Sequence, residues 1–318
     1  MPLIAHDSYK APWFLPNGHI QTIYPVLCRK VSIALKPRIF TIIMADGDFI
    51  DLDYYDKQSG KTLIVSHGLE GNSSRAYILG MARAFLAEGW NVVAWNYRGC
   101  SGRSNNTIKF YHSGCTEDLG EVVNFAANIG GVTQIALAGF SLGGNVVLKY
   151  LGNTAMVNQK ITHAVAISVP LDLHQGCRRL SESSNYLYEM RFLRTLKQKI
   201  RDKAVLFPEL DLRHLAHIHD LQKFDDYYTA PLHGFADALD YYRSCSSLFV
   251  LDEIKIPTLI INAKNDPFLP ESCFPHSALA DHHYIFLETP AHGGHVGFTA
   301  IDPEGRYWSE TRALQFVE

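Results

Sequence analysis

Short apolar runs alternate with amphipathic stretches along most of this chain. Continuous apolar runs predict buried strands, whereas apolar residues spaced three or four apart predict helices with one buried face. Strands are expected at 39–44, 49–55, 62–66, 91–95, 134–138, 163–169, 257–262 and 284–287. Helices are expected at 75–88, 117–128, 144–151 and 307–316. This alternation predicts an α/β fold, with a mostly parallel central sheet flanked by helices on both faces.

The segment from about residue 173 to 248 departs from this alternation, because its pattern is helical without a convincing strand. It lies between two predicted core strands, so we expect a helical insertion over the carboxyl edge of the sheet. Open α/β sheets bind their ligands at that edge. The chain is then one domain, residues 1–318, with a helical cap at about 173–248. Extra helices packed elsewhere on the domain are the alternative.

Composition narrows the classes of partner. The chain has 318 residues, 47% of them hydrophobic and 19% charged, which is typical of a folded globular domain with a sizeable core. A net charge of -3 argues against a nucleic-acid partner. No apolar run approaches the length of a membrane span, and Met1 to Lys10 lack a hydrophobic signal region. Six cysteines without a C-x-x-C pair predict free thiols and a cytoplasmic location.

The chemistry centres on a G-x-S-x-G pentapeptide at residues 139–143. A predicted strand precedes it and a predicted helix follows, which is the context of a nucleophile elbow. Such a turn holds its central residue in a strained conformation and needs small neighbours, which explains the glycines. Ser141 is therefore the candidate nucleophile, exposed at the end of a helix. A glycine-rich turn with a passive serine is the alternative.

A serine nucleophile needs a base, and the base needs an orienting acid. In this architecture the chain order is serine, acid, histidine. Asp266 follows the predicted strand 257–262 directly and is the preferred acid. Asp172, which follows an earlier strand, is the reserve, whereas Asp252 precedes its strand and so lies at the wrong end.

The base is expected in the glycine-rich loop 290–298, after the last predicted strand. Two histidines compete there. We prefer His295, which lies between Gly294 and the small residues that follow, over His292. An oxyanion would need two backbone N–H donors, and the predicted donors are Leu142, next to the nucleophile, and Leu69 in the turn after strand 62–66. Glu70 should then face away from the oxyanion. An ordinary strand-to-helix turn at 67–71 is the alternative.

Other polar clusters support no cofactor and no metal. The histidines near the C-terminus do not match a known ligand pattern, and the acidic run at 46–53 lacks the glycine and final glutamate of a calcium loop. Strand alternation accounts better for that run. Cys100 is expected to be a small buried residue and not a thiol nucleophile. His19 and His112 are expected to be structural polar groups or pocket lining.

The chain resembles the α/β-hydrolase superfamily, specifically its YheT-like branch of predicted hydrolases and esterases. The resemblance spans nearly the whole chain. It rests on the segments PNGHIQT (16–22), DGDFIDLD (46–53), SHGLEGNS (66–73), YRGCSG (97–102), YHSG (111–114), GFSLGGN (139–145), NDPF (265–268) and GHVGF (294–298). By this resemblance the family triad falls on Ser141, Asp266 and His295, and the fold is the α/β-hydrolase fold. Eukaryotic relatives often carry an N-terminal membrane anchor, which we expect this chain to lack.

The sequence therefore predicts a serine hydrolase, namely a carboxylesterase that acts on short to medium acyl esters through an acyl-enzyme intermediate. The expected partner is a small-molecule ester, without nucleic acid, and the oligomeric state stays open. Apolar residues at 186–196 are expected to line part of the pocket. The alternatives are a lipase, thioesterase or acyltransferase, or a non-catalytic ligand-binding protein on the same fold.

Overall fold

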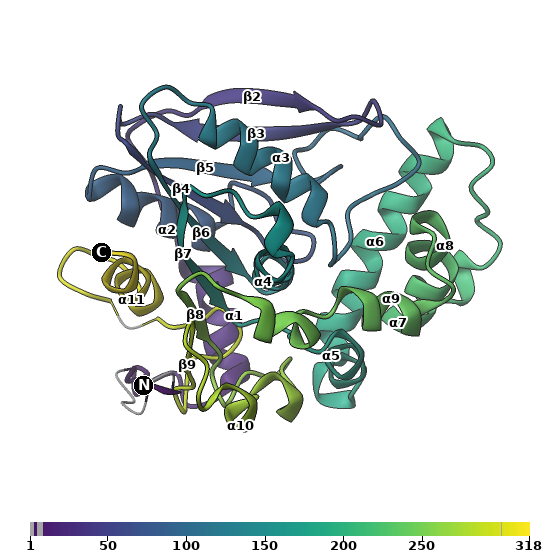
Figure 1. The fold of residues 1–318 in the computed structure, drawn as a ribbon. Helices are drawn as coiled ribbons and strands as arrows, with labels where there is room; N and C mark the ends of the chain where they lie inside the picture. Colours follow the sequence, from purple (N-terminus) through teal and green to yellow (C-terminus); the bar gives the residue numbers. More distant parts are fainter. Residues whose placement is uncertain (1–2, 5–8, 300) are drawn as a thin grey trace.

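A computed structural model describes residues 3–4, 9–299 and 301–318. Nine strands of this described part form one sheet, in the order β1-β9-β8-β7-β6-β4-β5-β3-β2 (Figure 1). The strands are β1 (Leu3–Ile4), β2 (Arg38–Ile43), β3 (Phe49–Tyr55), β4 (Lys61–Ser66), β5 (Asn91–Asn96), β6 (Gln134–Phe140), β7 (Ile161–Ile167), β8 (Thr258–Ile261) and β9 (Ile285–Glu288). Only the pairs β2–β3 and β3–β5 are antiparallel. The predicted α/β class with a mostly parallel sheet is confirmed.

Helices cover both faces of this sheet. The α-helices are α1 (Gly18–Cys28), α2 (Ala76–Ala87), α3 (Thr116–Ala127), α4 (Leu142–Gly152), α5 (Leu173–Leu180), α6 (Tyr186–Leu206), α7 (Leu221–Phe224), α8 (Ala230–His233), α9 (Ala238–Cys245), α10 (His276–Leu279) and α11 (Trp308–Val317). Short 3₁₀ helices are η1 (Thr154–Met156), η2 (Ser183–Asn185), η3 (Leu215–His217), η5 (Ser247–Glu253) and η6 (Glu271–Cys273), and η4 (Asp225–Thr229) is a π-helix.

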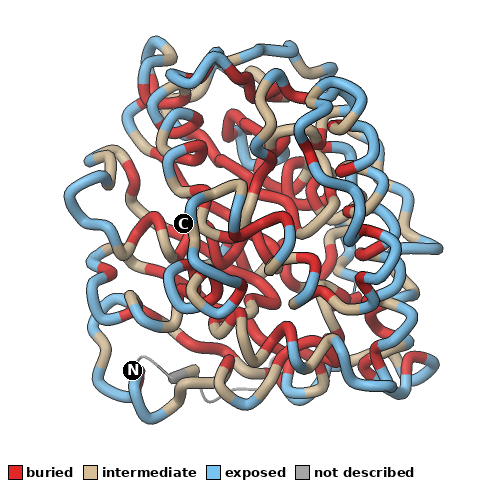
Figure 2. The backbone as a smooth tube through the Cα atoms, turned by 90° about the vertical axis from the view of Figure 1, so that its right-hand side faces the viewer, coloured by how far each residue is buried: buried red, intermediate tan, exposed pale blue. Residues whose placement is uncertain are grey.

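Two apolar cores lie on opposite faces of the sheet. On one face α3 and α4 pack through residues such as Val122 and Val146, and on the other α2 and α11 pack through residues such as Phe85 and Leu314. Every residue of β5 is buried, as a strand covered on both faces requires. Figure 2 shows the buried backbone gathered in the interior, with exposed backbone mainly at the periphery.

Each strand and helix expected outside 173–248 is present, with ends that differ by one or two residues. Helix α1 was not expected. Its buried positions include Gln21 and Thr22, whereas Ile23, Val26 and Leu27 are exposed or half-buried. The usual rule that the apolar face is buried is therefore inverted in α1, and hydrophobic periodicity could not indicate its orientation.

Residues 173–248 contain helices and, among their described residues, no strand. Helices α5 to α9 gather at one side of the sheet, in the green and teal part of Figure 1. They share an apolar core of their own, which includes Leu193, Leu196, Ile200, Phe224 and Tyr241. The π-helix η4 lies between α7 and α8 in this group.

The turn from β6 into α4 is the tightest junction near the sheet edge. Ser141 occupies it alone, with φ 54° and ψ −121°, a conformation that side-chain-bearing residues rarely adopt. Two residues later Gly143 passes close to the end of β4. A Cβ atom on Gly143 would lie 2.5 Å from the carbonyl oxygens of both Ser66 and His67.

We predict that Gly143→Ala lowers the free energy of unfolding by about 1–3 kcal/mol, because both obstructing atoms belong to the backbone and have little room to move. The matched control is Gly130→Ala, since Gly130 is exposed and a Cβ there would meet no atom within 4 Å. Urea unfolding of both variants tests the prediction. Equal stability of the two variants would contradict it.

Candidate active site

Ser141 is held at the carboxyl edge of the sheet by its neighbours. Its backbone N–H donates to the carbonyl of Ile167 on the adjacent strand β7, at 2.9 Å. Helix α4 begins at the next residue, so the helix N-terminus, with its partial positive charge, lies beside the serine. The strained φ of Ser141 is what lifts its hydroxyl clear of the strand.

The structure brings Ser141, His295 and Asp266 together. His295 Nε2 lies 2.9 Å from Ser141 Oγ, and His295 Nδ1 lies 2.8 Å from Asp266 Oδ2. Because a carboxylate only accepts hydrogen bonds, Nδ1 carries the proton and Nε2 of the neutral ring can accept one from the serine hydroxyl. Asp266 is buried, and its other oxygen accepts from the N–H of Phe268 at 2.9 Å.

The competing residues lie elsewhere. His292 is exposed, and its Nδ1 is 3.3 Å from the side-chain nitrogen of Asn265. Asp172 caps helix α5 by accepting from the N–H of Gln175 at 3.1 Å. Asp252 lies in η5, before β8, at the end of the sheet opposite to the serine.

The turn after β4 carries Leu69 next to the serine. Among the described residues, no hydrogen-bond acceptor is present for the backbone N–H of Leu69 or of Leu142. The carboxylate of Glu70 is held by the hydroxyl of Tyr111 at 2.8 Å and by Lys199 Nζ, on α6, at 2.7 Å. Glu70 has a positive φ of 52°, and its own N–H donates to the Tyr111 oxygen at 2.7 Å.

His67 fixes the same turn from within the core. Its Nδ1 lies 2.8 Å from the carbonyl of Gly68, and its Nε2 lies 3.3 Å from the N–H of Tyr97. Complete burial lowers the pKa of His67 to about 3. The ring is therefore neutral, donating through Nδ1 and accepting through Nε2, which suits a structural role better than proton transfer.

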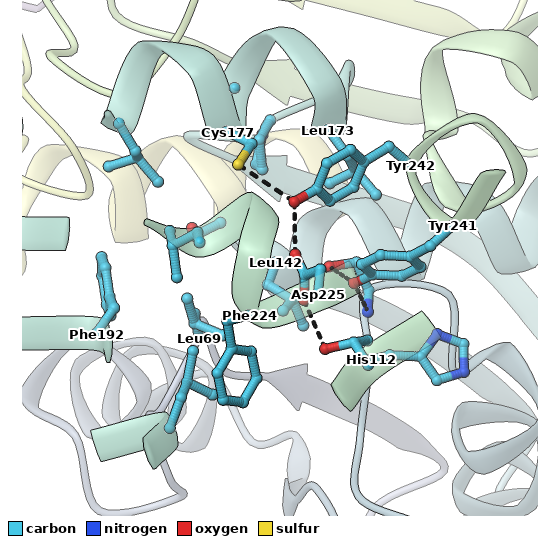
Figure 3. A pocket seen from close by; sticks show the side chains of 18 of the residues that line it. Leu69, His112, Leu142, Leu173, Cys177, Phe192, Phe224, Asp225, Tyr241 and Tyr242 are labelled. Carbon is cyan, nitrogen blue, oxygen red and sulfur yellow. Dashed lines mark hydrogen bonds between the residues drawn. The ribbon is translucent and has the colours of Figure 1, made fainter. Parts of the chain in front are cut away.

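Two spaces meet at the serine. A cavity of about 130 Å³ lies beneath α5, α6 and α9, and a groove of about 690 Å³ runs between α1, α2 and α6. Residues that line both spaces mark their junction: Leu69, Ser141, Phe192, Phe268 and His295. Figure 3 shows the cavity, with Phe192 and Leu69 set apart from Asp225 and Tyr242. The serine and histidine are thus reachable from both the cavity and the groove.

Comparison with known proteins shows the family of this chain. The alpha/beta hydrolase fold family matches residues 61–299. The candidate esterase YheT of Escherichia coli strain K12 is 35% identical, with 97% of this chain and 94% of YheT covered. The chain belongs to the α/β-hydrolase family.

More distant relatives carry more specific names. Phospholipase ABHD3 of Mus musculus is 27% identical to this α/β-hydrolase, covering 100% of this chain and 79% of the relative. Monoacylglycerol lipase ABHD2 of Homo sapiens is 25% identical, covering 99% and 80%. The solved structure of the Pyrococcus furiosus esterase Pf2001 superposes with a TM-score of 0.59 at 19% identity, over 91% of this chain and 97% of that one. At this identity the superposition shows the shared fold alone.

Helix α1 of this hydrolase holds the histidine loop in place, a role that sequence reasoning did not assign. Gln21 Oε1 accepts from the N–H of Gly293 at 2.7 Å and from the side chain of Asn265 at 3.0 Å. Thr22 Oγ1 accepts from the N–H of His295 itself at 2.8 Å. Gly294, at φ 57°, has no space for a Cβ because the backbone of α1 passes too close. Hydrophobic periodicity gives no signal for this contact, since the buried positions of α1 are the polar ones.

The other residues considered as functional candidates lie in surroundings that indicate structural roles. Burial raises the pKa of the Cys100 thiol to about 11, so it is a poor nucleophile. Asp46, Asp48 and Asp118 surround the guanidinium of Arg98. His19 stacks on Tyr188, and His112 lines the cavity. Within the described ranges, no group of three or more His, Cys, Asp or Glu residues could hold a metal ion.

In the part of the chain that the structure describes, no helix combines the length and the apolar character needed to cross a bilayer.

We predict that Gln21→Leu lowers the free energy of unfolding by about 1–3 kcal/mol, because the buried N–H of Gly293 and the half-buried side chain of Asn265 lose their acceptor. Gln198→Leu is the matched control, since Gln198 is exposed on α6 and bonds only to Asp202. Its effect should stay within about 0.5 kcal/mol. Urea unfolding measures both, and a Gln21 variant as stable as the control would refute the assignment.

Proposed function

We propose that this protein is a serine carboxylesterase that uses Ser141 as nucleophile, His295 as general base and Asp266 as the orienting acid. The hydrogen-bond chain of 2.9 and 2.8 Å through these three side chains carries the proposal. The names of the relatives, esterase, phospholipase and monoacylglycerol lipase, support ester hydrolysis as the class of reaction.

In the proposed reaction His295 Nε2 takes the hydroxyl proton while Ser141 Oγ attacks the ester carbonyl carbon. The tetrahedral intermediate collapses, the C–O bond to the alcohol breaks, and His295 returns the proton to the leaving oxygen. Water, activated by the same histidine, then attacks the acyl-enzyme and releases the acid. Asp266 stabilises the imidazolium that forms in each half of the reaction.

The oxyanion would accept hydrogen bonds from the N–H groups of Leu69 and Leu142. Both N–H groups lack an acceptor among the described residues, and both belong to residues that line the cavity beside Ser141. Donors that are already in position need no rearrangement as charge develops on the oxygen. Most of the stabilisation of the transition state arises from this preorganisation. The carboxylate of Glu70 is bonded to Lys199 and Tyr111, so its negative charge is already paired.

We assign the acyl group to the cavity and the alcohol to the groove. The cavity lies within the helices of 173–248, which we propose to be a cap on a single domain, and its walls are mainly apolar. Each methylene buried there contributes about 0.8 kcal/mol, so preference among short to medium acyl chains should be graded.

The six free cysteines further favour a reducing compartment such as the cytoplasm.

A second candidate, a lipase or phospholipase, is favoured by one surface. The groove is bordered by apolar side chains of α1, where Val26 is 59% and Leu27 is 75% exposed. Exposed apolar residues beside an active-site groove are typical of contact with a lipid surface. Two relatives are named for lipid substrates.

We predict that Ser141→Ala and His295→Asn each reduce kcat for p-nitrophenyl butyrate by about 10⁴-fold or more, as in other serine triads. His292→Asn, in the same loop, is the matched control and should retain activity. A fluorophosphonate probe should label the wild type and not Ser141→Ala. Near-normal turnover by Ser141→Ala would overturn the nucleophile, and an inactive His292 variant beside an active His295 variant would overturn the base.

We also predict that soluble C2 to C8 esters are turned over without an interface, because the cavity beside Ser141 is already formed. The test compares kcat/KM on these esters with the rate on monoacylglycerol emulsions and phosphatidylcholine vesicles, with Ser141→Ala as the blank. Activity that appears only above the aggregation threshold of the lipid would favour the second candidate instead.

A further inference from the structure

The acyl cavity is not apolar throughout. Among its lining residues, η4 and α9 contribute a carboxylate and several hydroxyl groups, from Asp225, Thr229, Tyr241 and Tyr242. None of these four lines the groove, and Figure 3 shows Asp225 and Tyr242 away from Phe192, which marks the junction of the two spaces. A polar cluster therefore stands in the cavity at a distance from its open end.

The carboxylate of Asp225 can accept more hydrogen bonds than it receives within the described part of the chain. Tyr242 donates its hydroxyl to Oδ2 at 2.6 Å, and Thr229 donates to Oδ1 at 2.5 Å. The Tyr242 proton is thereby committed, so the Cys177 thiol, 3.2 Å away, is a donor to the tyrosine oxygen. An ionised carboxylate accepts about four hydrogen bonds, so about two acceptor positions remain. Asp225 is half-buried and lines the cavity, which is where a further donor can reach it.

The charge of Asp225 is also uncompensated within the protein. In the described part of the chain, no Lys, Arg or His nitrogen forms an ion pair with this carboxylate. Burial raises the pKa of Asp225 to about 6, since the surrounding side chains are mostly apolar. A carboxylate in such a place is stabilised by any additional donor, and a bound ligand can supply one.

The backbone at this point is unusual as well. Asp225 and Thr229 are the first and last residues of the π-helix η4. Single-turn π-helices are rare and are frequent at functional sites. Here the π turn is joined at its two ends by the Thr229–Asp225 hydrogen bond, and both side chains line the cavity.

We propose that Asp225 forms a polar subsite in the acyl cavity that binds a hydrogen-bond donor, a hydroxyl or amino group, carried on the acyl chain of the substrate. The proposal rests on the function proposed above and deepens it by naming the substrate class. The ester is that of a hydroxy or amino acid whose donor group lies some carbons from the carbonyl. A purely structural role for Asp225, as a partner for Tyr242 and Thr229, is the outcome that the test separates.

The test uses pairs of p-nitrophenyl esters of increasing chain length. In each pair an ω-hydroxy acyl ester is compared with the alkyl ester that carries methyl in place of the hydroxyl, and the ratio of their kcat/KM values is measured. At the length that reaches Asp225, the ratio should be at least about tenfold lower in Asp225→Leu than in wild type, since a hydrogen bond to a charged group contributes about that much. An ω-amino series should respond in the same direction.

Asp226→Asn is the matched control. Asp226 is the neighbouring carboxylate of the same π turn, accepts from the N–H of Ala238 at 2.8 Å, and does not line the cavity. Its variant should keep the wild-type ratio. If Asp225→Leu does not fold, Asp225→Asn replaces it, because it removes the charge of the carboxylate with little change in volume, and it should lower the ratio.

Two results would overturn the inference. They are a wild-type ratio that does not rise at any chain length, and an unchanged ratio in the Asp225 variants. In each case alkyl esters would still be hydrolysed and Ser141 would still react with a fluorophosphonate. Failure of the proposed function is different, because the wild type would then hydrolyse neither ester of any pair.

Discussion

The backbone conformation of Ser141 is the constraint on which the rest of the site depends. A residue with a side chain is destabilised at φ 54°. The turn keeps this conformation only because the surrounding contacts fix it. The N–H of Ser141 is bonded to β7, and Gly143 lets α4 approach the end of β4. Asn145, fully buried in α4, then binds the carbonyls of Ser113 and Cys245 and so ties the elbow to the loop before α3 and to the end of α9.

The parts of the site are consequently held by separate regions of the molecule. The sheet and α4 hold the serine, α1 holds the histidine loop, and Tyr111 with Lys199 holds the turn that contains Leu69. Lys199 belongs to α6, so the helices over the cavity contact the turn directly. A shift of α6 would therefore alter both the shape of the cavity and the position of the Leu69 N–H.

Much of this arrangement could be predicted from local sequence. The G-x-S-x-G turn and the alternation of strands and helices are local signals, so the sheet, its helices and the position of Ser141 could be read directly. Asp266 and His295 could be selected because each follows a predicted strand, and in the structure His295 contacts both Ser141 and Asp266. The role of Gln21 could not be read, because its partner Gly293 is 272 residues away. The place of Asp225 could not be read either, since periodicity does not tell which polar residue of the helices in 173–248 faces a cavity.

The contact between α1 and the histidine loop also bears on how the protein is made. The ribosome synthesises a chain from its N-terminus to its C-terminus, and domains fold as their parts emerge. The serine turn can form once β4, β6 and β7 are available, but Gly293 and His295 reach Gln21 and Thr22 only after the chain has been translated through residue 295. Closing so long a loop is entropically costly and slow. The nascent polypeptide therefore carries the proposed nucleophile without the proposed base until the 154 residues that separate Ser141 from His295 have been added.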